Sequence, residues 1–408
     1  MFFASLALIL IAGGILGFLA KKIHISSLIV YLLLGIALGY FGLIDSHITA
    51  ISAELRKIAL IIILVKAGLS LNINDLKKVG RPAILLSFIP AVTEMVAVGL
   101  VGPSLLHISY LESFLLGSVL GAVSPAVVVP RMIKMIENSR GTDKGIPQMI
   151  IAGSSLDDII MIVCYTSFLT IEGGNSLNLM TFLNVPISIL SGVGAGILCG
   201  FILAFIFKKF HLRDSLKLTI ILGLCFGFVF LESFLAPWFE FSSLLAAITI
   251  GIVVLTMRPV QAHRIADKCD RLWTVAEIFL FILVGASIQL QALWSILGPA
   301  LIVIGVGLLL RMLSTFTCLF HTKLNFKEQL FVSISYTPKA TVQAAIGGGL
   351  LDLGNNLNNP AIQAAGLIVL TTSVVAIIFT APLGALAMDL SVNKLTTISQ
   401  NKEIEQIE

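Results

Sequence analysis

Long runs of apolar residues, separated by short polar segments, follow one another along the whole chain. A helix needs roughly 17 to 25 mainly apolar residues to cross the hydrocarbon core of a bilayer, and these runs have that length. The first run begins Met1-Phe2-Phe3 without a basic segment or a small-residue cleavage site, so we expect a retained helix there. The pattern predicts thirteen transmembrane helices, at residues 3–20, 26–43, 55–71, 82–103, 111–130, 147–171, 184–207, 216–234, 242–257, 272–290, 296–320, 326–350 and 361–388.

The composition points to the same fold class. Of the 408 residues 57% are hydrophobic and 12% are charged, and the mean hydropathy is +1.04. Soluble domains carry about 25% charged residues. A water-soluble fold cannot bury so much apolar surface, so the sequence predicts an all-α polytopic membrane protein.

Several kinds of chemistry are not indicated. Four of the five cysteines fall in predicted helices, Cys269 falls in a loop, and no CxxC pair occurs, so neither a disulfide framework nor a metal cluster is expected. The sequence has no GxxxxGK[ST] phosphate loop, so ATP is not expected to drive the protein. We expect no enzymatic activity, no cofactor and no nucleic-acid partner, and we attribute the net charge of +4 to orientation in the membrane.

The basic residues predict that orientation, because lysine and arginine favour cytoplasmic loops. Segments after the odd-numbered helices hold 21 of the 26 basic residues, and segments after the even-numbered helices hold only Arg56 and Lys57. We therefore expect the N-terminus outside and a short tail, residues 389–408, in the cytoplasm, with the protein in the plasma (inner) membrane. The three basic residues inside predicted helices are Lys66, Arg311 and Lys339.

A weak internal repeat divides the chain. The segments ILVKAGLSL and ILVGASIQL end the third and tenth predicted helices, and their glycines Gly68 and Gly285 are 217 residues apart. Helices 1–6 then match helices 8–13, and the single linker helix 184–207 makes the second half enter the membrane upside down. Inverted repeats with interrupted helices are typical of secondary transporters, whose binding site lies at the repeat interface. Chance similarity between apolar helices is the alternative.

Each half contains an interrupted helix. Ser124-Pro125 and Thr337-Pro338 place a residue that lacks an N–H group inside an apolar run, and the two prolines are 213 residues apart. Unwound backbone at membrane depth persists only where protein or a cavity surrounds it. If the breaks cross, we expect Lys339 to offset the negative ends of the half-helices and the two hydroxyl groups to cap freed backbone groups. A simple proline kink is the alternative.

Two adjacent carboxylates, Asp157 and Asp158, lie in the apolar segment GSSLDDIIM. Ionisable residues at membrane depth are costly and mark functional sites by default. Adjacent helical positions point about 100° apart, so one aspartate can face a cavity while the other faces a neighbouring helix. Two close carboxylates repel, so one binds a proton more readily, and a monovalent cation can replace that proton. This is the chemistry of cation/proton exchange, with a purely structural carboxylate pair as the alternative.

The offset of 217 also relates Glu94 to Arg311. A two-fold axis brings equivalent positions together when they lie near it, so we predict a buried ion pair between these residues. Removal of one partner is expected to cost roughly 3–5 kcal/mol, because it leaves the other charge buried alone. Direct ligation of the transported ion by this pair is the alternative, and Lys66 is expected to be structural.

These segments resemble a known transporter family. GAVSPAVVVP, GSSLDDI, LLRMLSTF and PKATVQAAIGG are similar to helix-5, helix-6, helix-11 and helix-12 motifs of the monovalent cation/proton antiporter superfamily, closest to its Nha-type sodium/proton antiporter branch. The resemblance covers nearly the whole chain. It implies a thirteen-helix fold in which a six-helix core moves as an elevator against a dimerisation domain.

The resemblance also implies a domain layout and a site. By analogy the dimerisation domain comprises 1–81 and 216–290, the core 82–171 and 296–388, with 184–207 as the linker and 389–408 as the tail. The family's essential cation and proton site maps to Asp158, and its first aspartate maps to Asp157, so these two would bind the transported Na+ or Li+. Family members carry lysine or arginine on helix 11, where this chain has Arg311. Because Glu94 and Lys339 add further charges, the resemblance does not determine the net charge moved in each exchange cycle. The expected supporting residues are Ser124, Pro125, Ser154, Thr337, Pro338 and Lys339.

The favoured function is secondary active exchange of Na+ or Li+ for H+ by a homodimer in the lipid bilayer. Exchange of K+ for H+ is the alternative, because the sequence does not determine ion size. A gated cation channel is less favoured, since no repeated filter loop is present. An intramembrane aspartyl protease would place its aspartates on different helices, one of them in a GxGD motif that this chain lacks.

Overall fold

The protein is helical throughout the part that the computed structural model describes, residues 2–22, 27–70, 80–173, 179–210, 212–235 and 241–398. Within these ranges no strand forms, and Arg140 and Ile398 make one isolated antiparallel bridge. Among the described residues, eight helical spans are long and apolar enough to cross a membrane, and the two shorter apolar helices are Ser27–Tyr40 and Ser243–Met257. The expected count of thirteen spans stays a prediction. The eight spans are Phe2–Ala20, Arg81–Leu106, Tyr110–Glu137, Ile146–Glu172, Ile187–Lys209, Asp214–Leu235, Leu293–Cys318 and Pro360–Leu395.

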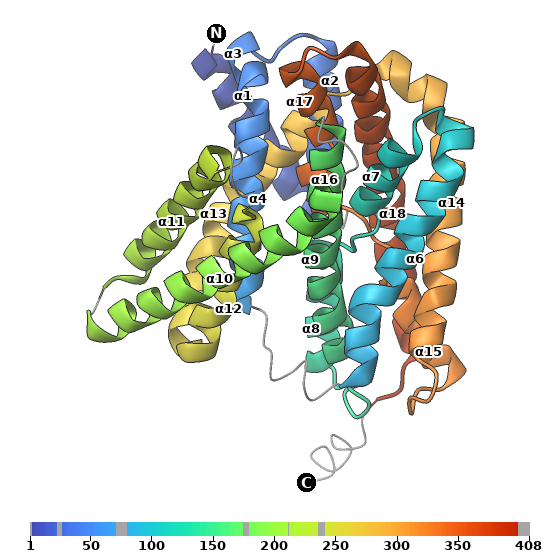
Figure 1. Cartoon of the computed structure of the whole chain (residues 1–408). Helices are drawn as coiled ribbons and strands as arrows, with labels where there is room; N and C mark the ends of the chain where they lie inside the picture. Colours follow the sequence, from blue (N-terminus) through green and yellow to red (C-terminus); the bar gives the residue numbers. More distant parts are fainter. Residues whose placement is uncertain are drawn as a thin grey trace. The chain divides into compact units, whose positions relative to one another are not determined.

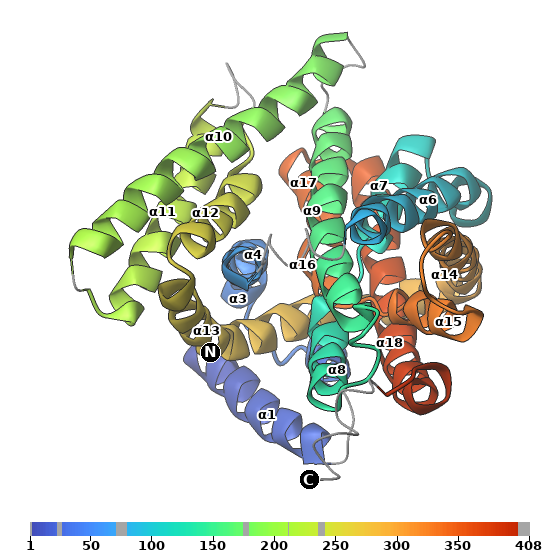
Figure 2. The ribbon, with the colours of Figure 1, turned by 90° about the horizontal axis from the view of Figure 1, so that it is seen from below.

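The chain forms two compact units, of which the first comprises Met1–Gly14, Ile44–Ile73 and Thr170–Leu283. Here α10 lies against α12, and α12 lies against α4 (Figures 1 and 2). Glycines four residues apart let α10 approach closely: a Cβ atom on Gly196 would lie only 2.8 Å from the Ala246 carbonyl oxygen. Small residues at this spacing are a common means of packing helices in membranes. The helices of this unit are α3 (Ser46–Ala50), α4 (Ser52–Ser70), α10 (Leu179–Lys209), α11 (Asp214–Leu235), α12 (Ser243–Met257) and most of α13 (Pro259–Ala286), with the first part of α1 (Phe2–Lys22).

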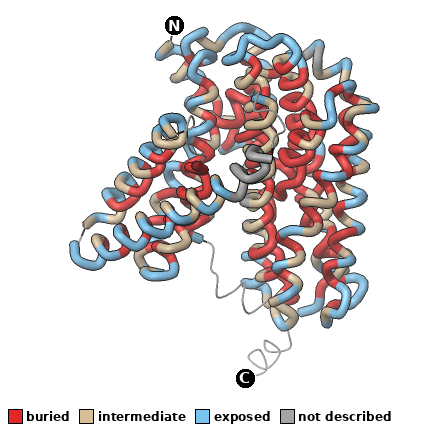
Figure 3. The backbone as a smooth tube through the Cα atoms, in the orientation of Figure 1, coloured by how far each residue is buried: buried red, intermediate tan, exposed pale blue. Residues whose placement is uncertain are grey.

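The second unit comprises Ile15–Leu43, Asn74–Leu169 and Val284–Glu408. Within it α6 runs beside α14, and α18 contacts α14, α15 and α17. The middle of α18 and most of α7 are buried where these helices meet (Figure 3). The helices are α2 (Ser27–Tyr40), α6 (Arg81–Leu106), α7 (Tyr110–Leu120), α8 (Pro125–Glu137), α9 (Ile146–Glu172), α14 (Leu290–Cys318), α15 (Phe326–Ser335), α16 (Thr341–Ile346), α17 (Gly349–Asn356) and α18 (Pro360–Leu395).

The units divide the chain differently from the expected domains in more than one place. Residues 284–290, expected at the end of the dimerisation domain, belong to the second unit. Residues 15–43, which the family analogy assigns to the dimerisation domain, cluster with the second unit. The two expected core segments, up to residue 169 and from residue 296, also lie in the second unit. The assignment of the units as dimerisation and core domains stays a prediction.

Two helix interruptions meet inside the second unit. The first lies between Leu120 at the end of α7 and Pro125 at the start of α8, and the second lies between Ser335 and Thr341. Pro125 begins α8 at a position where its missing N–H group has no helical acceptor to lose. The N–H group of Ser124 donates to the carbonyl oxygen of Pro338 at 2.9 Å, so the two breaks are joined through their backbones.

Several expected bounds are wrong. Helix α8 ends at Glu137 rather than at residue 130, α14 begins at Leu290 rather than at residue 296, and α18 ends at Leu395, so the helix extends into the expected tail 389–408. Two further differences are larger. Helix α13 begins at Pro259 rather than at residue 272, so Cys269 lies in a helix and not in a loop, and it is buried. The first half of α13 is amphipathic, with Ala262, Ile265 and Cys269 buried on one face. The sequence analysis looked for long uninterrupted apolar runs and missed this half, because charged residues interrupt the run there. The expected helix 326–350 is interrupted twice and forms α15, α16 and the start of α17.

Candidate functional site

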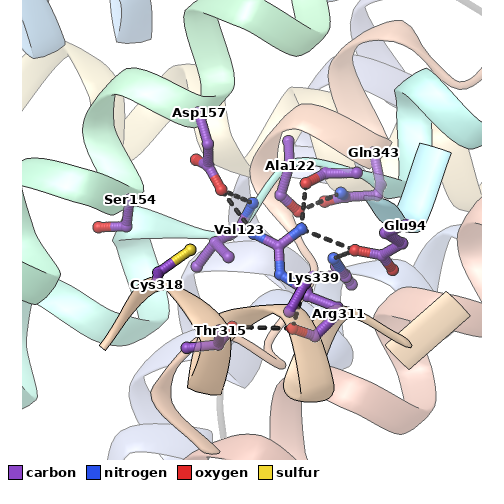
Figure 4. Close-up of polar contacts among 12 residues, drawn as sticks. Glu94, Ala122, Val123, Ser154, Asp157, Arg311, Thr315, Cys318, Lys339 and Gln343 are labelled. Atoms are coloured by element: carbon purple, nitrogen blue, oxygen red, sulfur yellow. Dashed lines mark hydrogen bonds and ion pairs between the residues drawn. The ribbon is translucent and has the colours of Figure 1, made fainter. Parts of the chain in front are cut away.

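The guanidinium group of Arg311, on α14, joins three other elements beside the crossing. Arg311 is fully buried, and its Nη1 lies 2.7 Å from Oε2 of Glu94 on α6 while its Nη2 lies 2.6 Å from Oδ2 of Asp157 on α9. Nη1 also donates to the carbonyl oxygen of Gly121, just after α7. Figure 4 shows the guanidinium group between the carboxylates of Glu94 and Asp157. One cation thus binds two carboxylates and an end of an interrupted helix.

Lys339, in the second interruption, binds the same carboxylate oxygen of Glu94 as Arg311 does. Its Nζ lies 2.6 Å from Oε2 of Glu94, and its backbone N–H donates to Oγ1 of Thr380 on α18 at 2.9 Å. Sequence reasoning expected Lys339 to offset the negative ends of the half-helices. In the structure the Lys339 ammonium group is directed toward Glu94, and Arg311 contacts the carbonyl group of Gly121.

Gln343, on α16, completes the first interruption. Its amide Nε2 donates to the carbonyl oxygens of Val119 and Ala122, both at 2.9 Å. The last carbonyl groups of a helix have no partner within it, so this amide satisfies groups that the break leaves free. Sequence reasoning assigned Gln343 no role, although a buried amide in the motif PKATVQAAIGG was a usable signal.

The two aspartates of α9 have different surroundings. Asp157 is fully buried; besides Arg311, its Oδ2 accepts a hydrogen bond from the backbone N–H of Val123 at 3.3 Å. Asp158 is partly exposed, and no described residue forms a hydrogen bond or ion pair with its carboxylate. One oxygen of each carboxylate, Oδ1, is buried without a hydrogen-bond partner among the described residues.

The charges of this cluster balance without Asp158. Glu94 and Asp157 are opposed by Arg311 and Lys339, and all four side chains are buried and linked by ion pairs. A buried charge is tolerated when it is paired in this way. Asp158, the fifth ionisable residue, is therefore the carboxylate for which the described residues supply no paired cation.

The remaining predicted residues of the site lie at the crossing or on α9. The Ser124 hydroxyl group lies 3.5 Å from the Thr341 hydroxyl group, whereas Thr337 Oγ1 donates back to the Ile334 carbonyl oxygen near the end of α15 at 2.8 Å. Ser154 is buried, and its hydroxyl group donates to the Ile151 carbonyl oxygen on α9 at 3.3 Å. Pro125 begins α8, and the Pro338 carbonyl oxygen accepts the hydrogen bond from Ser124. Of the two expected hydroxyl groups, that of Ser124 thus contacts a residue across the crossing, and that of Thr337 bonds locally.

Lys66 does not belong to this cluster. It lies in the first unit, where its ammonium group pairs with Asp270 and links α4 to α13. The contact agrees with a structural role for Lys66.

Curated proteins give the sequence context of this site. Sodium/hydrogen exchanger 9B2 of Mus musculus is 32% identical over 366 residues, which cover 88% of this chain and 65% of that protein. The human protein of the same name is 33% identical over 83% of this chain and 63% of its own length, and human sodium/hydrogen exchanger 9B1 is 31% identical over 90% and 72%. The chain therefore spans just under two thirds of the length of these 9B2 relatives.

Solved structures give the fold context. A structure of the sodium proton antiporter MjNhaP1 from Methanocaldococcus jannaschii at pH 8 matches with a TM-score of 0.81 at 24% identity, covering 96% of this chain and 97% of that one. An electron-microscopy structure of the same antiporter matches with a TM-score of 0.75 at 25% identity, covering 96% of each chain. The fold is therefore that of this antiporter.

A family model decides the assignment. The model described as "Sodium/hydrogen exchanger, transmembrane" matches residues 6–386, which is nearly the whole chain. Together with the apolar helices, this match identifies a multi-pass integral membrane protein. The chain belongs to the sodium/hydrogen exchanger family.

Proposed function

We propose that this protein is a secondary active antiporter that exchanges Na+ or Li+ for H+. The observation that carries the proposal is the aspartate pair beside the crossing, where Asp157 is paired and Asp158 is not. The relatives named as sodium/hydrogen exchangers support the same chemistry. K+ is the alternative ion.

In this proposal Asp158 is the residue that holds either the proton or the cation. Because the other four buried charges balance one another, one added positive charge neutralises the site whether it arrives as H+ or as Na+. Binding both at once would leave an excess charge at membrane depth, which is costly. The two ions therefore compete for one carboxylate, and Asp157 supports the bound ion with its free oxygen.

We infer that the site moves as part of one rigid body. The five charged residues and both interruptions belong to the second compact unit, so a motion of that unit would carry the whole site with it. This arrangement supports the elevator type of alternating access that the family resemblance implies. The homodimer, the N-terminus outside and the plasma (inner) membrane belong to the same proposal.

Proton flux in proteoliposomes tests the proposed function. Purified protein is reconstituted with a pH gradient and a fluorescent pH reporter, and Na+, Li+ or K+ is added in turn. We expect Na+ and Li+ to dissipate the gradient and the Asp158→Asn protein to give no response. A response to K+ alone favours K+/H+ exchange, and wild-type flux by the Asp158→Asn protein refutes the assignment of the site.

A further inference from the structure

Tyr336 packs its ring against the charged centre of the site. It is the residue at the end of α15, it is fully buried, and its ring centroid lies 5.5 Å from Cζ of Arg311. A guanidinium group within about 6 Å of an aromatic face is attracted to the ring. The contact links the second interruption to the cation that holds Glu94 and Asp157.

The ring supplies a restraint that the ion pairs of Arg311 do not. Hydrogen bonds to a guanidinium group lie in its plane, and here they involve only the two terminal nitrogens. The third nitrogen, Nε, is buried without a partner among the described residues. The group can therefore tilt about its contacts with Glu94 and Asp157 unless something packs on its face.

The hydroxyl group of Tyr336 occupies the space that a side chain at Gly153 would need. A Cβ atom built on Gly153 would collide with Oη of Tyr336, while the next atoms, Cζ of Tyr336 and Cβ of Leu86, would lie 3.2 Å away. Oη itself is buried without a hydrogen-bond partner among the described residues. Because its hydroxyl group has no partner to hold it, the close fit against Gly153 is what places the ring.

These contacts form a closed chain. Gly153 lies four residues before Asp157, so the two residues share a face of α9. Helix α9 thus places the tyrosine through Gly153, the tyrosine packs on Arg311, and Arg311 binds Asp157 on the same helix. We propose that Tyr336 and Gly153 are positioning residues, which hold the Arg311 guanidinium group in the orientation that pairs Asp157 and leaves Asp158 unpaired.

This inference rests on the proposed exchange function and makes a prediction about suppression. Gly153→Ala displaces the tyrosine ring from Arg311, and the apparent Na+ affinity is expected to fall about tenfold, a loss within the range of a desolvated cation–ring contact. The Gly153→Ala/Tyr336→Phe double variant lacks Oη. The atoms nearest to the new Cβ atom are then Cβ of Leu86 and Cζ of the ring, both at 3.2 Å, a distance that a small shift accommodates. We expect the double variant to regain the apparent affinity and the pH profile of Tyr336→Phe alone.

The chain offers a matched control for this pair. A Cβ atom on Gly349 would collide with Oη of Tyr165 and would lie 3.2 Å from its Cζ, the same steric relationship in the same unit. The ring that packs on Arg311 is that of Tyr336. Gly349→Ala should therefore lower the thermal unfolding midpoint while leaving the apparent Na+ affinity and the pH profile of exchange unshifted.

The experiment measures Na+-driven proton flux against pH in proteoliposomes, and the unfolding midpoint in detergent, for these variants. If Gly153→Ala does not fold, Tyr336→Leu, which lacks the ring, replaces it in the experiment. Like Gly153→Ala, Tyr336→Leu should shift the pH profile of exchange. The proposal is overturned if Gly153→Ala and Gly349→Ala behave alike, if Tyr336→Phe fails to restore Gly153→Ala, or if Tyr336→Leu leaves the pH profile unshifted. Absence of flux from the wild-type protein would instead contradict the proposed function itself.

Discussion

Replacing Arg311 by glutamine removes three polar contacts, with Glu94, Gly121 and Asp157, and also the ring contact with Tyr336. Glu94 keeps Lys339 as a partner, but Asp157 keeps only the N–H group of Val123. Replacing Glu94 by glutamine has a smaller effect, because Arg311 keeps Asp157 and only Lys339 loses its carboxylate. The sequence repeat alone predicts nearly equal effects, whereas these contacts predict that loss of Arg311 is the more damaging.

The magnitude follows from the charges. Breaking a buried ion pair by removing one partner costs about 3–5 kcal/mol of unfolding free energy, and we expect Glu94→Gln at the lower end and Arg311→Gln at the upper end. Each single change leaves the four-residue cluster with one unbalanced charge, while the double change leaves Lys339 and Asp157 balanced. The double variant should therefore lose less than the sum of the single losses, with a coupling of about 2–3 kcal/mol, in the upper part of the range for contacting residues.

The assay is a double-mutant cycle on unfolding of the purified protein in detergent, followed by intrinsic fluorescence. The expected order of midpoints is wild type, Glu94→Gln, Arg311→Gln and then the double variant, whose midpoint should lie close to that of Arg311→Gln and well above the value that the summed single losses give. The pair Arg131 and Asp389 is the control, because two hydrogen bonds of 3.0 Å join them but 57% of the Asp389 side chain is exposed. Its cycle should give a coupling below about 1 kcal/mol. Additive losses at Glu94 and Arg311, or a lower midpoint for Glu94→Gln than for Arg311→Gln, would refute the reasoning.

Three further predictions concern the same site. Asp158→Asn should abolish cation-driven proton flux, because an amide cannot exchange a proton for a cation. Asp157→Asn should lower the apparent Na+ affinity and leave residual flux. Full activity of purified Asp158→Asn protein in liposomes would contradict the role of Asp158. Because protons and cations compete for one carboxylate, the Na+ concentration for half-maximal flux should rise as the pH falls, and glutamine at four histidines should leave that dependence unshifted; a large shift would favour a separate pH sensor. Gln343→Leu should lower the unfolding free energy by about 1–3 kcal/mol, because it leaves two buried carbonyl groups without a donor, and an unchanged midpoint would contradict that role. The four histidines are His263 on α13, His321 after α14, and His24 and His211, which lie outside the described residues.

Sequence reasoning identified residues near the predicted repeat axis better than residues away from it. The offset of 217 relates Glu94 to Arg311, and the structure joins their side chains at 2.7 Å. The same offset separates Ser124 from Thr341, whose hydroxyl groups lie 3.5 Å apart, whereas matching the two prolines gave an offset of 213. At a helix break, residue type is a poor guide to which positions of the two halves correspond, because several residue types can end a helix there.

Contacts away from the predicted axis could not be predicted from the proposed repeat. That Arg311 also binds Asp157, or that Lys339 is directed toward Glu94, depends on helix rotation and on side-chain rotamers, which an apolar pattern does not specify. The start of α13 was missed for a related reason, since the charged first half of that helix interrupts the apolar run.

The contact between positions 94 and 311 has a consequence for how the proposed repeat arose. If both halves descend from one duplicated segment, a residue at such a contact faces the equivalent position of the other half. Just after duplication the two positions held identical residues. Two glutamates or two arginines, buried and 217 positions apart, would have repelled each other. The present pairing of opposite charges could therefore arise only after duplication, when one copy could change alone. Once it had arisen, the two halves carried different residues at this contact and were no longer interchangeable.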